Sequence, residues 1–313
     1  MGRTAWTIAA LGALGGTAVA GDLDETRAVA GSMSDAITLE HGSNRGVSQN
    51  YLVMPDGGEL SGQMRFVMSE PALGTEPLRF SDLGLFDLSG RWSLLSKLEV
   101  SGSVTLVPKQ PSYTTEHPWQ SAGIGLRSPL GKKVALSLTG GGGHLLDHGG
   151  LWTREALAIE WRKPIMELLD FGITGGVDGI SLSAPHEKSA VITELALGTS
   201  ALFREPTGHW GAWVGIAYAL PVFSQGADPT THMTVDPQAR LDFRVGSVLS
   251  VNRQWDLYAE LAVIDRGDLS NPATRLPILD GGFDQRQIVM GVTRHLEGTT
   301  KRPMRGDLAL QAE

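Results

Sequence analysis

The amino-acid sequence predicts an all-β protein, a closed antiparallel up-and-down transmembrane β-barrel of about twelve strands. Three observations predict this fold. Apolar residues recur at every second position in successive segments, the links between segments alternate between short and long, and the tryptophans lie at segment ends. A period of two is typical of strands whose two faces meet different surroundings.

The N-terminal residues 1–20 have the parts of a secretory signal peptide. They carry one basic residue, Arg3, then a short apolar centre, and end in the small residues Ala18, Val19 and Ala20. We therefore expect an exported protein. The sequence contains no cysteine, which excludes a lipoprotein attachment thiol, a disulfide framework and a thiolate metal site.

Composition limits how the chain can meet a membrane. Glycine accounts for 40 of 313 residues and charged residues for 19%. Beyond the signal no run of about 18 apolar residues occurs, so any membrane crossing must use strands. The net charge of -8 offers no basic surface, and we expect no nucleic-acid partner.

Twelve segments carry the alternation. In the tenth, the apolar residues Leu241 and Phe243 alternate with the charged residues Arg240 and Asp242. The segments are 59–68, 79–92, 97–107, 119–127, 132–140, 151–162, 169–182, 190–203, 209–222, 239–251, 255–266 and 285–295.

The links between these segments alternate in length. After the even segments they are short: 93–96, 128–131, 163–168, 204–208 and 252–254. After the odd segments they are mostly longer and rich in Pro, Gly, Asp and Thr, as in 108–118, 141–150, 223–238 and 267–284. Outer-membrane barrels have this asymmetry, with short periplasmic turns and long external loops.

The tryptophans give an independent indication. All seven beyond the signal lie at or near segment ends: Trp92, Trp119, Trp152, Trp161, Trp210, Trp213 and Trp255. Because tryptophan prefers the boundary between water and lipid, we predict that all of these except Trp213 form an aromatic girdle at the membrane interface. A soluble β-sandwich also alternates, but it would be expected to bury some tryptophans in mid-strand.

Residues 59–295 resemble the outer-membrane β-barrel proteins of Gram-negative bacteria, in particular the porin-like group with about twelve strands. The last segment, Gln285 to Leu296, looks like the closing strand of such barrels and should pair with the first, since closure removes unpaired edges in lipid. The resemblance implies an outer-membrane location, with membrane lipid and the barrel assembly machinery as partners. No cofactor is expected.

Two features depart from this family. Many members end at an aromatic residue on the closing strand, whereas here Leu296 follows His295 and a polar tail, 297–313, comes after. Residues 21–50 are rich in Asp, Glu, Ser and Gly and are predicted to be a loosely ordered periplasmic lead or a partial plug. The predicted barrel domain is 51–296.

The position of each charged residue within its segment predicts which side chains line the lumen. Glu155 is an exception, since it falls on the apolar face of its segment. With a turn near Arg253, Glu260 faces Gly246 and lies diagonal to Arg244, which predicts an ion pair between Glu260 and Arg244. The predicted lumen-lining residues are Glu59, Arg65, Asp87, Arg91, Glu99, Arg127, Arg154, Glu160, Asp178, Glu194, Arg240, Asp242, Arg244, Asp256, Tyr258 and Glu260.

These charges support two interpretations of the lumen. They can line a narrow passage for small polar solutes, because such side chains replace part of a solute's hydration, or they can pair with one another inside a plugged barrel. Strand number alone does not decide between them. The first alternative function is a closed barrel that serves surface interaction or adhesion through its outer loops. The second is a soluble secreted β-sandwich that binds a carbohydrate or protein.

Two enzyme families share the barrel architecture, the outer-membrane phospholipase and the lipid A-modifying barrels. A serine hydrolase needs a histidine within hydrogen-bond reach of its nucleophile. His209 and His295 lie at predicted periplasmic ends, and neither has a serine two residues away. We therefore predict that the chain is not an enzyme.

The external loops contain further histidines and a glycine run, and we predict no metal site there. His144 and His148 are four residues apart, which suits a metal only on a helix, and the glycines around them indicate a flexible loop. Residues 139–143 lack the Gly-Lys-Ser/Thr of a phosphate loop and are predicted to bend a loop at the membrane exit. The histidines placed in external loops are His117, His144, His148, His186 and His232.

Overall fold

A computed structural model describes most of the predicted barrel. The predicted signal peptide, periplasmic lead and polar tail lie outside the described residues. The described ranges are 57–69, 78–95, 98–107, 119–131, 133–145, 150–166, 168–184, 189–204, 210–227, 234–252, 254–266, 278 and 285–296.

Each of the twelve predicted segments corresponds to one strand. The strands are β1 (Gly58–Ser69), β2 (Leu78–Leu95), β3 (Leu98–Leu106), β4 (Trp119–Pro129), β5 (Val134–His144), β6 (Leu151–Met166), β7 (Leu169–Ser183), β8 (Ala190–Arg204), β9 (Trp210–Gly226), β10 (Arg240–Ser250), β11 (Trp255–Asp265) and β12 (Gln285–His295). None of the described residues forms a helix long and apolar enough to cross a membrane.

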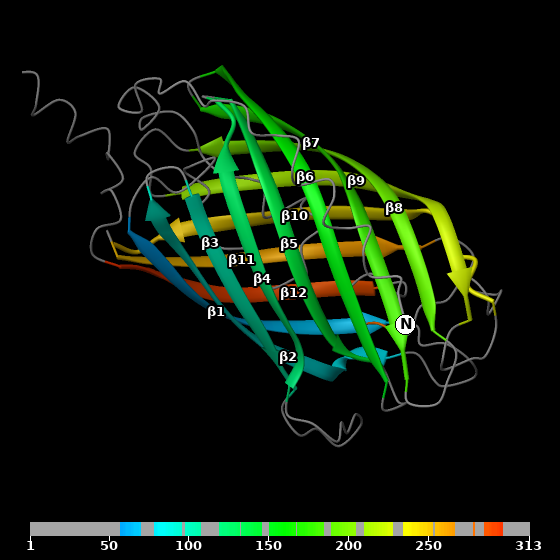
Figure 1. Ribbon diagram of the computed structural model, residues 1–313. Helices are drawn as coiled ribbons and strands as arrows, with labels where there is room; N and C mark the ends of the chain where they lie inside the picture. Colours follow the sequence, from blue (N-terminus) through cyan, green and yellow to red (C-terminus); the bar gives the residue numbers. More distant parts are fainter. Residues whose placement is uncertain are drawn as a thin grey trace, which may run out of the picture.

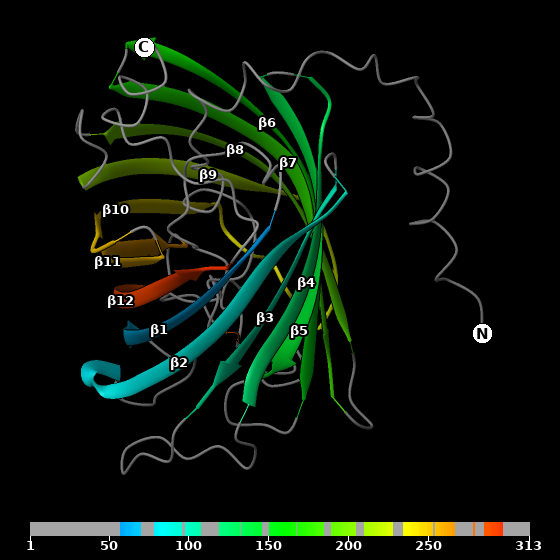
Figure 2. The ribbon, with the colours of Figure 1, turned by 90° about the vertical axis from the view of Figure 1, so that its left-hand side faces the viewer.

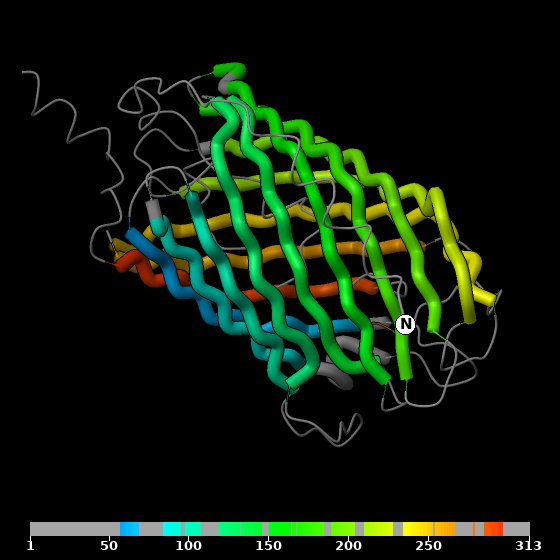
Figure 3. Tube along the Cα trace, in the orientation of Figure 1, coloured from blue at the N-terminus to red at the C-terminus, as the bar shows by residue number. Residues whose placement is uncertain are grey.

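The strands form one closed barrel in which every strand pairs with its neighbours in the chain. Figures 1 and 2 show the strands wrapped around a common interior, and β12 pairs antiparallel with β1 to complete the circle (Figure 3). Glu59 lies opposite His295, and Ser69 lies opposite Gln285. The predicted fold class and the predicted pairing of the first and last segments are confirmed.

The two faces of the wall differ in polarity, and the outer face is the apolar one. On β6, Arg154 is buried inside the barrel while Leu157 and Ile159 are exposed. Ile124 is 72% exposed and Leu197 is 61% exposed on other strands. A surface this rich in large apolar side chains is stable against hydrocarbon and not against water. Since all twelve described strands belong to one closed barrel and not to two stacked sheets, the soluble β-sandwich alternative is wrong.

The alternation of short and long links is confirmed, although several strands extend into the predicted links. Residues 141–144 and 223–226 belong to β5 and β9 and not to loops. The prediction that residues 139–143 bend a loop is therefore wrong. These glycines allow close approach of neighbouring strands, because a Cβ on Gly143 would lie 2.3 Å from the backbone oxygen of Gln120.

Inside the barrel, aromatic rings lie over glycines of the adjacent strand. Trp213 is opposite Gly246, and Tyr258 is opposite Gly291. Both aromatic side chains belong to one buried apolar cluster with Val289. The glycines leave room for the rings against the wall, an arrangement that fixes the register of the strands.

Replacement of Gly246 with alanine is expected to lower the free energy of unfolding by about 1–3 kcal/mol, the usual effect of overpacking. Its new Cβ would lie 2.2 Å from the Trp213 ring and 2.8 Å from the backbone oxygen of Ala259. Urea unfolding of protein refolded into lipid vesicles measures the change. Gly175→Ala is the control, since nothing lies within 4 Å of a Cβ there, and equal stability of the two variants would contradict the expectation.

Candidate functional site

The charged interior of the barrel is the candidate functional site. Of the sixteen side chains predicted to line the lumen, fifteen belong to buried residues. The remaining one, Asp242, is 16% exposed and lies 3.3 Å from Arg240 Nε. The interior therefore gathers charges of both signs from strands all around the barrel.

The buried charges of the described chain are paired. Each of its eight buried arginines lies within ion-pair distance of a carboxylate. Pairing is required because an isolated charge in a low-dielectric interior costs several kcal/mol. The predicted pair between Arg244 and Glu260 is confirmed at 3.4 Å, with Gly246 opposite Glu260 and Trp213 Nε1 donating to Glu260 Oε2 at 3.2 Å.

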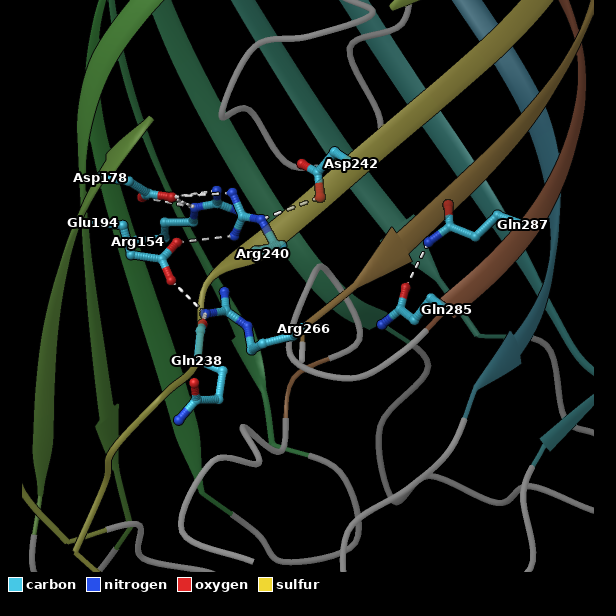
Figure 4. A network of polar contacts seen from close by, with 9 residues as sticks. All are labelled: Arg154, Asp178, Glu194, Gln238, Arg240, Asp242, Arg266, Gln285 and Gln287. Atoms are coloured by element: carbon cyan, nitrogen blue, oxygen red, sulfur yellow. Dashed lines mark hydrogen bonds and ion pairs between the residues drawn. The ribbon is translucent and has the colours of Figure 1, made fainter. Parts of the chain in front are cut away.

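The largest group of charges lies where the long links leave the barrel. We call it the external-end cluster, because this end is predicted to be the external one. Figure 4 shows these side chains converging from β6, β7, β8 and β10 and from the end of β11. Its members are Arg154, Asp178, Glu194, Arg240, Asp242 and Arg266.

Glu194 is at the centre of the external-end cluster. Its Oε2 atom lies 3.1 Å from Arg240 Nη1, and its Oε1 atom accepts a hydrogen bond from Arg266 Nη1. Arg266 also donates to the backbone oxygen of Gln238 at 3.2 Å, so the pair holds the chain just before β10. On the other side, Arg154 Nε donates to Asp178 Oδ1 at 2.8 Å.

An apolar contact covers part of the same end. Val235 and Ile278, which belong to the β9–β10 and β11–β12 connections, are fully buried against the inner wall. Gly226 has φ of 98°, a conformation that favours glycine, and its oxygen accepts a hydrogen bond from Val235 N at 3.2 Å. We call Val235 and Ile278 the external cover. The wall residues beneath them are Leu145, Trp152, Ile180, Leu182, Ala190 and Ile192.

Asp87 organises a second cluster in the middle of the barrel. It accepts hydrogen bonds from Gln63 at 2.8 Å, from Arg65 at 3.0 and 3.1 Å and from Thr105 at 2.7 Å. Tyr258 donates to Gln63 Oε1 at 2.5 Å. This cluster joins β1, β2, β3 and β11 across the interior.

A third cluster lies at the short-turn end, where β12 meets β1. His295 Nδ1 is 3.1 Å from Glu59 Oε1, and His295 Nε2 is 2.9 Å from Asp256 Oδ2. Arg91 continues the cluster, at 3.2 Å from Glu59 and 3.5 Å from Glu99. With a carboxylate at each ring nitrogen, His295 offers no nitrogen to a serine hydroxyl. That the chain is not an enzyme stays a prediction.

Sequence reasoning missed four inward charges, all near segment ends. They are Arg162, Asp170, Arg266 and His295. The first three have the same parity within their segments as residues that were predicted correctly to face inward, such as Glu160 for Arg162. Extending the alternation to both ends of each segment would have found these three, whereas no residue of 285–295 had been predicted to face inward.

The predicted position of one tryptophan, Trp152, at the membrane interface is wrong. Trp152 is 1% exposed, and its Nε1 donates to the backbone oxygen of His144 at 3.1 Å. Its even position on β6 gives it the inward direction of Arg154, and this parity outweighs its place at the strand end. Trp92, Trp119, Trp210 and Trp255 are exposed on the outer face, and Trp161 is half-buried.

Of the five histidines predicted in the external loops, only His144 lies within the described residues. His144 ends β5, and its ring centroid lies 4.4 Å from that of Trp119, so it does not belong to a flexible loop. His117, His148, His186, His209 and His232 lie outside the described residues. Within the described part of the chain, no group of three or more His, Asp or Glu side chains could hold a metal.

No protein-family model matches the sequence, and no curated protein matches it. Several solved structures are similar to this chain. The NanC porin has a TM-score of 0.48 at 9% identity, over 76% of this chain and 100% of its own. The translocator domain of autotransporter NalP from Neisseria meningitidis has a TM-score of 0.45 at 8% identity, over 77% of this chain and 88% of its own. LpxR from Salmonella typhimurium has a TM-score of 0.45 at 9% identity, over 76% of this chain and 100% of its own.

Proposed function

We propose that the chain is an outer-membrane channel for small polar solutes, with a narrow passage that is closed at rest. One observation carries the proposal: side chains of both charges face the interior at every level of the barrel. They extend from Glu59 and His295 at the short-turn end, through Arg65 and Asp87, to Arg266 at the opposite end. Such a lining replaces part of a solute's hydration shell and selects by charge.

The proposed location in the outer membrane is supported by the apolar outer surface of the barrel and by the different lengths of the links at its two ends. A closed barrel with an exposed apolar face satisfies its backbone groups in lipid. Short turns then lie in the periplasm and the longer connections outside the cell. Membrane lipid, the barrel assembly machinery and small polar solutes are the proposed partners, and the aromatic girdle is proposed from Trp92, Trp210 and Trp255 at the short-turn end and Trp119 at the other.

The closed state is supported by how tightly the external end is packed. Glu194, Asp178 and Arg266 have no exposed surface, and the external cover lies on the inner wall beside them. Twelve strands enclose a lumen between the filled eight-stranded case and the open channel of about 16 strands. A barrel of this size can therefore be closed by a few inward side chains.

The same packing favours a second candidate function. A barrel permanently closed by the external cover would serve as a support for its external connections, which would then act in surface interaction or adhesion. This candidate differs from the channel in one measurable property, since it conducts no ions under any condition.

Planar-bilayer recording of the refolded protein tests the channel. We expect small discrete currents, and we expect Arg244→Gln to shift the reversal potential towards cation selectivity because Glu260 loses its partner. Glu155→Gln is the control, because Glu155 is exposed on the outer face and its charge should not affect the passage. If neither the wild-type protein nor a variant without the external cover conducts, the channel proposal fails.

A further inference from the structure

A groove of about 600 Å³ crosses the outer face of β11, β12, β1, β2 and β3 near the short-turn end. Its floor contains Gly62 and Gly102, which have no side chains to fill it, and Gly90, over which the Trp92 ring lies. Gly90 lies directly opposite Gly102, and residues of both β2 and β3 line the groove. The volume falls within the range of roughly 300–1,000 Å³ that is usual for ligand pockets.

One end of the groove carries a positive charge beside an aromatic ring. Arg294 lies opposite Leu60 on β1 and opposite Trp255 on β11, and its guanidinium carbon is 5.5 Å from the centroid of the Trp255 ring. Trp92 also lines the groove. The residues that line the groove include this one basic residue and no acidic one, so the groove is complementary to an anionic group.

We propose that this groove binds one glycerophospholipid of the periplasmic leaflet, with its phosphate on Arg294 and one acyl chain over Gly62 and Gly102 beside the Trp92 ring. Tryptophans at barrel ends lie at headgroup level, which places Arg294 where lipid phosphates lie. An acyl chain gains little free energy by exchanging its lipid neighbours for an apolar protein surface. The preference of the lipid for the groove over the surrounding bilayer therefore comes from close packing and from the charge-assisted contact with Arg294.

A second copy of the chain fits this groove less well than a lipid. A two-fold contact would bring the same surface from both copies together. Both copies would then contribute an arginine and no carboxylate from the groove. The phosphate of a lipid supplies the missing negative charge.

Native mass spectrometry of the detergent-purified protein, titrated with palmitoyl-oleoyl-phosphatidylglycerol, tests the proposal. Gly102→Leu fills the groove without a clash, since its Cβ would meet only the backbone oxygen of Gly123 at 3.9 Å. We expect the wild-type protein to hold one lipid and Gly102→Leu to hold none. Arg294→Gln should weaken binding about tenfold, which corresponds to one charge-assisted contact.

Gly175→Leu is the matched control, because Gly175 also faces outward on β7 with nothing within 4 Å of its Cβ. Heat-modifiable migration on gels verifies that each variant is folded. Equal lipid occupancy in Gly102→Leu and Gly175→Leu would overturn the proposal, as would equal binding of a diacylglycerol without phosphate. A dimer that Gly102→Leu abolishes would assign the groove to a second copy instead.

Discussion

Replacement of Glu194 with leucine is expected to lower the free energy of unfolding by about 3–5 kcal/mol, the usual consequence of removing one partner of a buried ion pair. Arg266 Nη1 would keep its hydrogen bond to the backbone oxygen of Gln238 at 3.2 Å. Arg240 would keep Asp178 at 3.9 Å and Asp242 at 3.3 Å. The expected loss therefore comes from the one carboxylate that Arg240 and Arg266 share.

The double variant Glu194→Leu/Arg266→Met separates this effect from a simple change of shape. It removes both members of the pair, and buried ion pairs replaced by apolar residues are often nearly neutral in stability. Guanidinium unfolding of vesicle-refolded protein should show the double variant to be more stable than the single one. If the single variant is as stable as the double, the charge of Arg266 is satisfied by other means and the account of the external-end cluster is wrong.

The strands and their inward faces could be predicted from the sequence because alternate residues of each strand face lipid and the polar interior. The first set must be apolar, and the second can be charged. On β10 and β11 this contrast is nearly complete, so residues such as Arg240 and Glu260 were placed correctly. The prediction for the glycines of β5 was wrong because the local composition indicated a loop. Their conformation is decided by pairing with β4 on one side and β6 on the other.

The partners of the inward charges could be predicted only where strands are adjacent. Arg244 and Glu260 lie on neighbouring strands, and their pair follows from the register. Arg266 and Glu194 come from β11 and β8, which are separated by β9 and β10 in the barrel. Their contact depends on how side chains from distant strands pack in the interior. The alternation of residues within one strand does not indicate this packing.

The burial of the external cover could not be predicted from the sequence for a similar reason. Val235 and Ile278 lie in the long links, where no periodicity marks them as inward. Their burial becomes visible only when the closed barrel places Ile180, Leu182 and Ile192 beneath them.

Replacement of Ile278 with aspartate is expected to open the channel. Ile278 has no exposed surface and packs on apolar wall residues, where an unpaired carboxylate would cost several kcal/mol. The cover should therefore leave the wall. Since each 1.4 kcal/mol changes an equilibrium about tenfold, the open fraction in planar bilayers should rise by a factor of ten or more. Ile278→Val, which keeps the apolar contact, should change it far less.

Movement of the cover can be measured independently of current because the chain has no cysteine. A cysteine introduced at Val235, which is buried beside Ile278, should react slowly with a membrane-impermeant maleimide and much faster when Ile278→Asp is added. Faster labelling together with larger currents identifies the cover as the gate. Faster labelling without any current would contradict the channel proposal, because the barrel would then stay closed even after Val235 and Ile278 had left the wall.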